Sequence, residues 1–176
     1  MKTTAAALLA ATFVVTGCIV PPGSQTKNNG SSPATSSRNA QMLQPTEAQD
    51  AKLASALRQQ ATNKDTSAAI AESSDVISKF LRINSCITGY NASALNAFAA
   101  PGKNFPSFNY LNAPIPLMRY HDKGSCATVL RIQGWQMPTK NALQFEVVYT
   151  SDASGETIKM SNEVVRQPTG AWLFTR

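Results

Sequence analysis

The sequence lacks most of the patterns on which catalysis and nucleic-acid binding depend. Its 176 residues include one histidine, but no Cys-x-x-Cys pair, glycine-rich phosphate loop or Gly-x-Ser-x-Gly nucleophile elbow. The 16 basic residues outnumber the 10 acidic ones but form no run, whereas nucleic-acid binding needs basic residues clustered among stacking aromatics. We therefore expect no nucleic-acid binding, no metal or other cofactor, and no catalytic residues.

The chain also lacks an apolar run that could cross a membrane as a helix, which takes about 20 residues. Its charge-free apolar stretch, 5–15, is about half that length and follows the positive charge of Lys2. Such a stretch is typical of the hydrophobic region of a secretory signal peptide, which has about 7 to 15 residues. No repeat with a period of about 20 to 50 residues is visible, so we do not expect a solenoid.

The apolar stretch ends in Val15-Thr16-Gly17-Cys18. An aliphatic residue, two small residues and a cysteine in this order resemble the lipobox of bacterial lipoproteins, although Thr is not the commonest residue at its position. The resemblance covers residues 1–18 and implies removal of a signal peptide, 1–17, followed by acylation of Cys18 at its sulfur and its amino group. Two or three acyl chains would anchor the protein stably in a lipid bilayer. By the rule for enteric lipoproteins, Ile19 in place of Asp favours the outer membrane.

Residues 18–44 comprise the lipid anchor and a tether rich in Ser, Thr, Asn, Gln, Pro and Gly. We expect the tether to be disordered, because this composition buries too little apolar surface to offset the entropy of ordering. A buried N-terminal helix with an incidental cysteine would not explain such a segment. About 26 tether residues reach roughly 30 Å on average and about 90 Å when extended. The remaining residues, 45–176, suit a single periplasmic domain.

Helices are expected at the start of this domain. Thr46 and Gln49 have the spacing of a capping box at the start of a helix over 47–60. Apolar residues recur at helical spacing over 67–84, which predicts a second helix. A short helical turn is expected at 94–99.

The hydrophobic period then changes to that of strands, which we expect at 125–135, 142–150, 156–166 and 171–175. The connections are short and carry turn residues, so neighbouring strands should be antiparallel. Alternating side chains give the sheet one apolar and one polar face. The sequence therefore predicts an α+β fold, with N-terminal helices packed on one face of a curled antiparallel sheet of about four strands.

The predicted alternation places Cys126, Leu130 and Ile132 on the inward, apolar face and Arg131 on the polar face. Over residues 67–176, the order of the elements resembles the cystatin-like or nuclear-transport-factor-like α+β roll. The resemblance lies in element order and not in a sequence motif.

With Cys18 acylated, Cys86 and Cys126 are the two remaining cysteines. Exported proteins enter an oxidising compartment, where thiols pair, so we predict a disulfide between the second helix and the first strand. Two free buried thiols are the alternative. A redox or metal role would need a partner such as Cys-x-x-Cys or a nearby histidine, and the local sequence offers neither.

His121 and Asp122 stand in a polar stretch just before the first strand. We interpret His121 as a turn or surface residue, because no spacing identifies partners for a catalytic triad or a metal site. Nuclear-transport-factor-like enzymes place a His or Asp at the mouth of the roll, however. The alternative is therefore a small-ligand-binding or enzymatic roll, with a cavity lined by Phe145, Met160 and Trp172.

The segment 101–117 combines four prolines with several large apolar side chains. Phe105, Phe108 and Tyr110 could anchor a protein partner, because rigidly held aromatics often dominate binding. The segment could also close the open end of the roll and bury these rings, which is the interpretation we favour.

We therefore expect a non-enzymatic lipoprotein of the cell envelope, anchored in the outer membrane with its domain facing the periplasm. It would bind a protein of a secretion, conjugation or other envelope complex through the segment 101–117, the polar sheet face, or both.

Overall fold

The computed structural model describes residues 42–58, 63–89, 92–105 and 113–175, all of which belong to one compact unit, 39–176. The predicted signal peptide, Cys18 and the tether up to residue 41 lie outside the described residues.

The domain begins with the α-helices α1, Glu47–Leu57, and α2, Lys64–Asn84. The predicted capping box is present at α1: the Gln49 N–H donates to Thr46 Oγ1 at 3.3 Å, and the Thr46 N–H donates to Gln49 Oε1 at 2.9 Å. α2 begins before the predicted residue 67, because the side chain of Asn63 caps it by accepting a backbone hydrogen bond of 2.8 Å.

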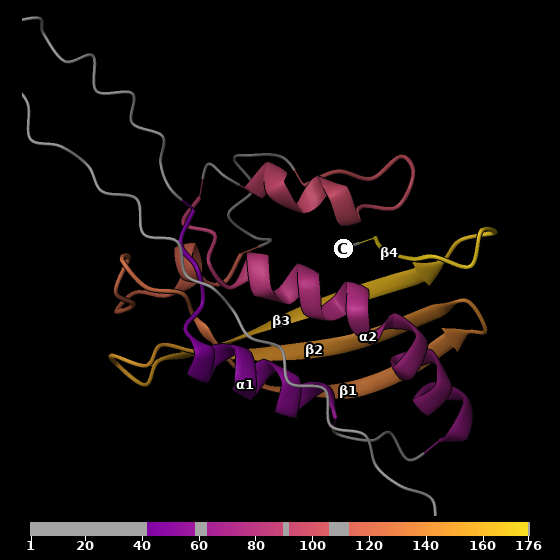
Figure 1. The fold of residues 1–176 in the computed structure, drawn as a ribbon, viewed down its shortest axis with the longest axis horizontal. Coiled ribbons are helices and arrows are strands. Elements are labelled where there is room, and N and C mark those ends of the chain that lie inside the picture. Colours follow the sequence, from indigo (N-terminus) through magenta and orange to yellow (C-terminus); the bar gives the residue numbers. More distant parts are fainter. Residues whose placement is uncertain (1–41, 59–62, 90–91, 106–112, 176) are drawn as a thin grey trace, which may run out of the picture. The chain divides into compact units, whose positions relative to one another are not determined.

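The 3-10 helices η1, Ala92–Phe98, and η3, Ile115–Leu117, precede a four-stranded antiparallel sheet with the order β1-β2-β3-β4. Its strands are β1 (Thr128–Thr139), β2 (Ala142–Thr150), β3 (Thr157–Arg166) and β4 (Trp172–Phe174). Figure 1 shows α1 and α2 on one face of this sheet. The predicted α+β architecture, with helices packed against one face of an antiparallel sheet, is confirmed.

The core lies between α2 and the inward face of the sheet. Phe80 of α2 stacks on Phe174 of β4, with ring centroids 3.7 Å apart. The alternation predicted for β2 is correct, because every second side chain is fully buried; these are Leu143, Phe145, Val147 and Tyr149.

β1 departs from the predicted alternation. Val129 pairs with Tyr149 and Arg131 pairs with Val148, so Leu130 is the extra residue of a β-bulge. Val129 is 3% exposed, whereas Leu130 is 45% exposed. The prediction that Leu130 faces the core was therefore wrong, because the bulge interrupts the period of two on which it rested.

β1 also continues through Pro138 and Thr139, where we expected a turn. The connection to β2 consists of Lys140 and Asn141 alone, with Thr139 paired to Ala142. Proline is tolerated at this position because β1 is an edge strand of the sheet. An edge strand has a neighbouring strand on one side only, so a missing backbone N–H need not remove a hydrogen bond between strands.

Candidate functional site

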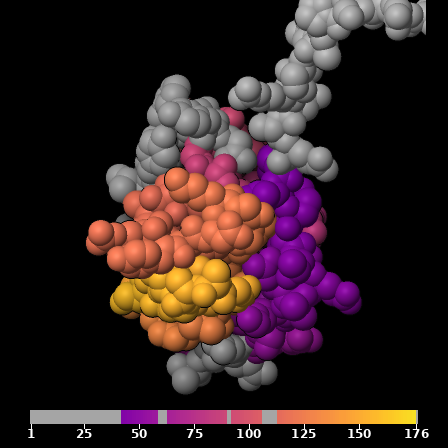
Figure 2. All heavy atoms as spheres, turned by 90° about the vertical axis from the view of Figure 1, so that its left-hand side faces the viewer, coloured from indigo at the N-terminus to yellow at the C-terminus, as the bar shows by residue number. Residues whose placement is uncertain are grey.

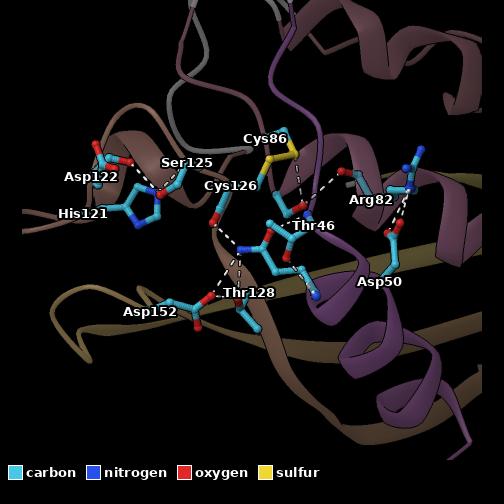
Figure 3. The surroundings of a disulfide bond; sticks show 12 residues. Thr46, Asp50, Arg82, Cys86, His121, Asp122, Ser125, Cys126, Thr128 and Asp152 are labelled. Atoms are coloured by element: carbon cyan, nitrogen blue, oxygen red, sulfur yellow. Dashed lines mark hydrogen bonds and ion pairs between the residues drawn. A yellow bond between two sulfur atoms is a disulfide. The ribbon is translucent and has the colours of Figure 1, made fainter.

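A buried disulfide joins the end of α2 to the segment before β1. The sulfurs of Cys86 and Cys126 lie at bonding distance, 1.98 Å, and both residues are at most 2% exposed. The Ala127 N–H also donates to the Ser85 carbonyl at 2.8 Å. Figure 3 shows the bond between the helix and the strand that follows Cys126. The two cysteines thus connect helix to sheet, as the sequence predicted.

Beside the disulfide, Gln49 connects α1 to two parts of the sheet. Its amide nitrogen donates to the Cys126 carbonyl at 2.8 Å, to Thr128 Oγ1 at 3.0 Å and to Asp152 Oδ2 at 3.3 Å. Thr128 also donates to Asp152 at 2.6 Å, and Lys52 lies 3.5 Å from the same carboxylate. The hydrogen bond from Thr128 is the main reason why the pKa of Asp152 lies below its usual value.

His121 was predicted to be a turn or surface residue: it stands directly before a turn closed by the Ser125 N–H and the Asp122 carbonyl, but it is buried, 9% exposed, so the surface alternative was wrong. Its Nε2 lies 2.9 Å from the Ser125 carbonyl oxygen, which can only accept, so Nε2 is the donor of this hydrogen bond. Nδ1 is buried and has no hydrogen-bond partner among the described residues. The loop brings the ring of His121 to the Ser125 carbonyl, four residues further along the chain (Figure 3).

Among the described residues, Asp122 is not hydrogen-bonded to His121. Its Oδ1 accepts a hydrogen bond of 2.9 Å from the Gly124 N–H, a local turn interaction. Hollows of about 310 Å³ and 460 Å³ occur on the described surface, and neither residue lines them. Of the side chains expected around an enzymatic cavity, Phe145 borders the smaller hollow, while Met160 and Trp172 border neither.

The aromatic anchors expected in the segment 101–117 are only partly described. Phe105 is 3% exposed and packs 5.4 Å from the ring of Phe80, so the favoured interpretation, burial of the ring, is correct for Phe105, and the alternative of a partner-binding anchor is wrong for it. Its ring serves the closure of the core instead. Phe108 and Tyr110 lie outside the described residues.

An exposed aromatic does occur just after this segment. Tyr120 is 65% exposed, and the guanidinium of Arg119 lies 5.3 Å from the centroid of its ring. Leu117, at the end of η3, is 39% exposed, and Lys123 is also exposed. We call Leu117, Arg119, Tyr120 and Lys123 the Tyr120 surface.

Glu156, just before β3, holds the backbone of this surface. Its two carboxylate oxygens accept hydrogen bonds from the N–H groups of Arg119, at 2.9 Å, and Tyr120, at 2.7 Å. These bonds, the one from Arg119 first, hold the pKa of the Glu156 carboxyl below its usual value. Figure 2 shows the orange loop that follows residue 113 lying directly against the yellow turn between β2 and β3, with the purple residues of α1 beside both.

Sequence reasoning missed the Tyr120 surface because its support is not local. Glu156 is 36 positions from Tyr120 in the chain, and the contact depends on how the β2–β3 turn meets the loop. The one local signal was the adjacent pair Arg119-Tyr120, two residue types that are common at binding hot spots.

Over the part of the chain that the structure describes, no helix is both long and apolar enough to cross a membrane. Within the same ranges, no group of three or more His, Cys, Asp and Glu residues is arranged to hold a metal ion. Comparisons with protein families, curated proteins and solved structures found no match to this chain.

Proposed function

We propose that this chain is an acylated lipoprotein of the cell envelope whose domain binds an envelope protein through the Tyr120 surface. Cys18 supplies the anchor, and the segment up to the domain supplies the tether. The disulfide between Cys86 and Cys126 supports export, because such bonds persist in oxidising compartments. A secretion, conjugation or other envelope complex is the class of partner that suits a tethered domain of this kind.

The observation that carries the proposal is the exposed ring of Tyr120 on a backbone held by Glu156. Part of the cost of binding is the entropy of ordering loops and side chains, so a loop whose backbone is already held loses less freedom when it meets a partner. Tyrosine and arginine are among the commonest hot-spot residues, and here they form one unit, with Arg119 over the Tyr120 ring. The interaction itself is non-enzymatic and needs no cofactor.

Anchoring would strengthen such an interaction. A tether that confines the domain near the membrane raises its effective concentration toward a partner in the same membrane. A modest surface can therefore suffice for binding in the envelope.

The anchor is tested by the Cys18→Ala variant. We expect this variant in the soluble fraction of disrupted cells, because it lacks the acylated sulfur, while the unaltered chain sediments with membranes. Equal membrane association of the two proteins would contradict the lipoprotein assignment.

The binding surface is tested by mild crosslinking in intact envelopes, followed by pull-down of the full chain. We expect a specific partner whose recovery falls at least about tenfold in Tyr120→Ala, as loss of a hot-spot side chain would cause. The matched control is Lys140→Ala, in the turn between β1 and β2 at the opposite end of the strands, which should recover the partner normally. Equal recovery with both variants would contradict the assignment of the surface.

A further inference from the structure

The carboxylates near the Tyr120 surface are engaged within the domain. Both oxygens of Glu156 accept backbone N–H groups, and Asp122 accepts the Gly124 N–H. Asp152, in the same β2–β3 turn as Glu156, accepts hydrogen bonds from Gln49 and Thr128. Each of these acidic groups therefore keeps its negative charge but directs at least one oxygen at a donor of the domain.

The basic side chains of the Tyr120 surface, unlike the nearby carboxylates, have few partners within the described part of the domain. Arg119 and Lys123 are exposed, and among the described residues neither takes part in an ion pair within 4 Å. The Arg119 guanidinium instead lies over the Tyr120 ring. One cation without an ion pair thus lies against the exposed aromatic ring, and a second, Lys123, follows three residues after Tyr120 in the chain, whereas the nearby acids accept hydrogen bonds from N–H and O–H donors of the domain.

From this arrangement we infer that the partner of the Tyr120 surface is a protein that presents an acidic patch. The inference rests on the proposed function and names the chemistry of the partner. Complementary charge steers association and rejects partners of the wrong sign. Arginine in particular can pair with a carboxylate through two parallel hydrogen bonds. An acidic protein surface therefore fits Arg119 and Lys123, while the partner's apolar atoms would cover Tyr120.

An anionic bilayer is the other surface that cations and a tyrosine could meet. Interfacial membrane binding, however, buries a continuous apolar face into the boundary between headgroups and acyl chains. The Tyr120 surface offers one aromatic and one aliphatic side chain, Tyr120 at 65% and Leu117 at 39% exposure. This apolar content suits a small protein pocket better than a lipid surface.

The test uses the full chain in nanodiscs of neutral phosphatidylcholine and dye-labelled peptides of six glutamates or six glutamines. We expect the glutamate peptide to bind, to bind about tenfold more weakly when the salt is raised from about 50 to about 300 mM, and to outcompete the glutamine peptide. Arg119→Gln combined with Lys123→Gln should weaken glutamate binding about tenfold. The matched control, Lys64→Gln combined with Lys140→Gln, removes two exposed cations elsewhere and should change binding less than about twofold.

Equal binding of the two peptides, or equal losses in the two double variants, would overturn the inference. Binding to phosphatidylglycerol vesicles without binding to the glutamate peptide would assign the surface to lipid and overturn it as well.

The pull-down separates this inference from the proposed function. If Tyr120→Ala loses the envelope partner but the Arg119 and Lys123 double variant keeps it, the partner is not recognised by acidic groups and the proposed surface stands. If Tyr120→Ala keeps the partner, the proposed surface itself is wrong.

Discussion

At the scale of single residues, Leu130 shows how one extra residue in a strand redirects a side chain. The bulge pairs Val129 with Tyr149 and Arg131 with Val148, so Leu130 has no partner opposite it and lies 45% exposed. The side chain of Val129, just before it, is buried in the core. A core position is therefore decided by pairing and not by the hydrophobicity of the residue.

The bulge makes a direct prediction. Leu130→Thr should change the free energy of unfolding by less than about 0.5 kcal/mol, because a half-exposed side chain is lost. Ile132→Ala should cost about 2 to 4 kcal/mol, because Ile132 is 1% exposed and its removal leaves a cavity. Urea denaturation of both variants measures the difference, and equal losses would mean that Leu130 belongs to the core.

Glu156 predicts a pH dependence of the loop that it holds. Its pKa in the folded protein lies below the ordinary value of 4.5, so its contribution to stability is present above that pH. As the pH falls through the lowered pKa, the carboxylate gains a proton and the contribution is lost. We expect Glu156→Gln to have a lower melting temperature than the unaltered protein at pH 7. Below about pH 4 the difference between the two melting temperatures should be smaller. A difference that stayed constant over this range would argue against the ionised carboxylate as the holding group.

At the scale of elements, α1 depends on one polar junction more than on its apolar stripe. Of its 11 residues, Leu53 and Ala56 are the buried apolar ones. Gln49 is buried as well, and its side chain both completes the capping box and donates to β1 and the β2–β3 turn. The start of α1, its docking on the sheet and the position of the turn before Glu156 are thereby coupled.

The Gln49→Glu variant tests this coupling. Glutamate keeps the oxygen that accepts the Thr46 N–H, but it replaces the donating amide with a second oxygen that faces Asp152 and the Cys126 carbonyl. We expect a loss of at least about 2 kcal/mol in the free energy of unfolding at pH 7, because acceptors then face one another in a buried place. Adding Asp152→Asn supplies a donor and should restore about half of the loss. No loss of stability in Gln49→Glu would show that Gln49 acts through the capping box alone, because glutamate keeps that contact, whereas a loss without rescue by Asp152→Asn would show that Asp152 is not the group that opposes the new carboxylate.

The edge strand β1 carries protection against pairing with other chains. It has register shifts at Val129/Arg131 and at Gln133/Gln136, and Pro138 near its end. Bulges and proline both interrupt the row of edge N–H and C=O groups on which a second strand could add. Binding by strand addition is therefore disfavoured at β1, which agrees with a recognition surface on loops.

At the scale of the whole molecule, the disulfide joins the helical half of the domain to the sheet. Cys86 and Cys126 are 40 positions apart, and the chain-entropy relation gives about 4 kcal/mol for closing a loop of that size in the unfolded chain. Replacing both cysteines with alanine should lower the free energy of unfolding by about that amount. Urea denaturation measures it, and a loss below about 1 kcal/mol would show that the bond adds little. In the native, unreduced protein neither cysteine should react with a thiol label, and labelling of both would contradict the bond.

The sequence by itself determined the local elements and their order. The capping box of Thr46 and Gln49, the helical spacing in α2 and the alternation in β2 are short-range patterns, and each produced the element that it predicts. The α+β class follows from them, because an apolar helix stripe and a one-sided sheet can bury their apolar faces only against each other. The pairing of Cys86 with Cys126 needed one chemical argument, that cysteines of an exported chain pair.

The tertiary structure alone decided which side chains are buried and which are free to bind. His121 is buried although it stands in a polar stretch, and Phe105 is buried against Phe80 of α2. The side chain of Tyr120 is exposed, and its backbone is held by Glu156, which accepts the Tyr120 N–H from a distant turn. Local sequence patterns carry no information about contacts between residues far apart in the chain, and the backbone of the candidate binding surface is held by such a contact, from Glu156.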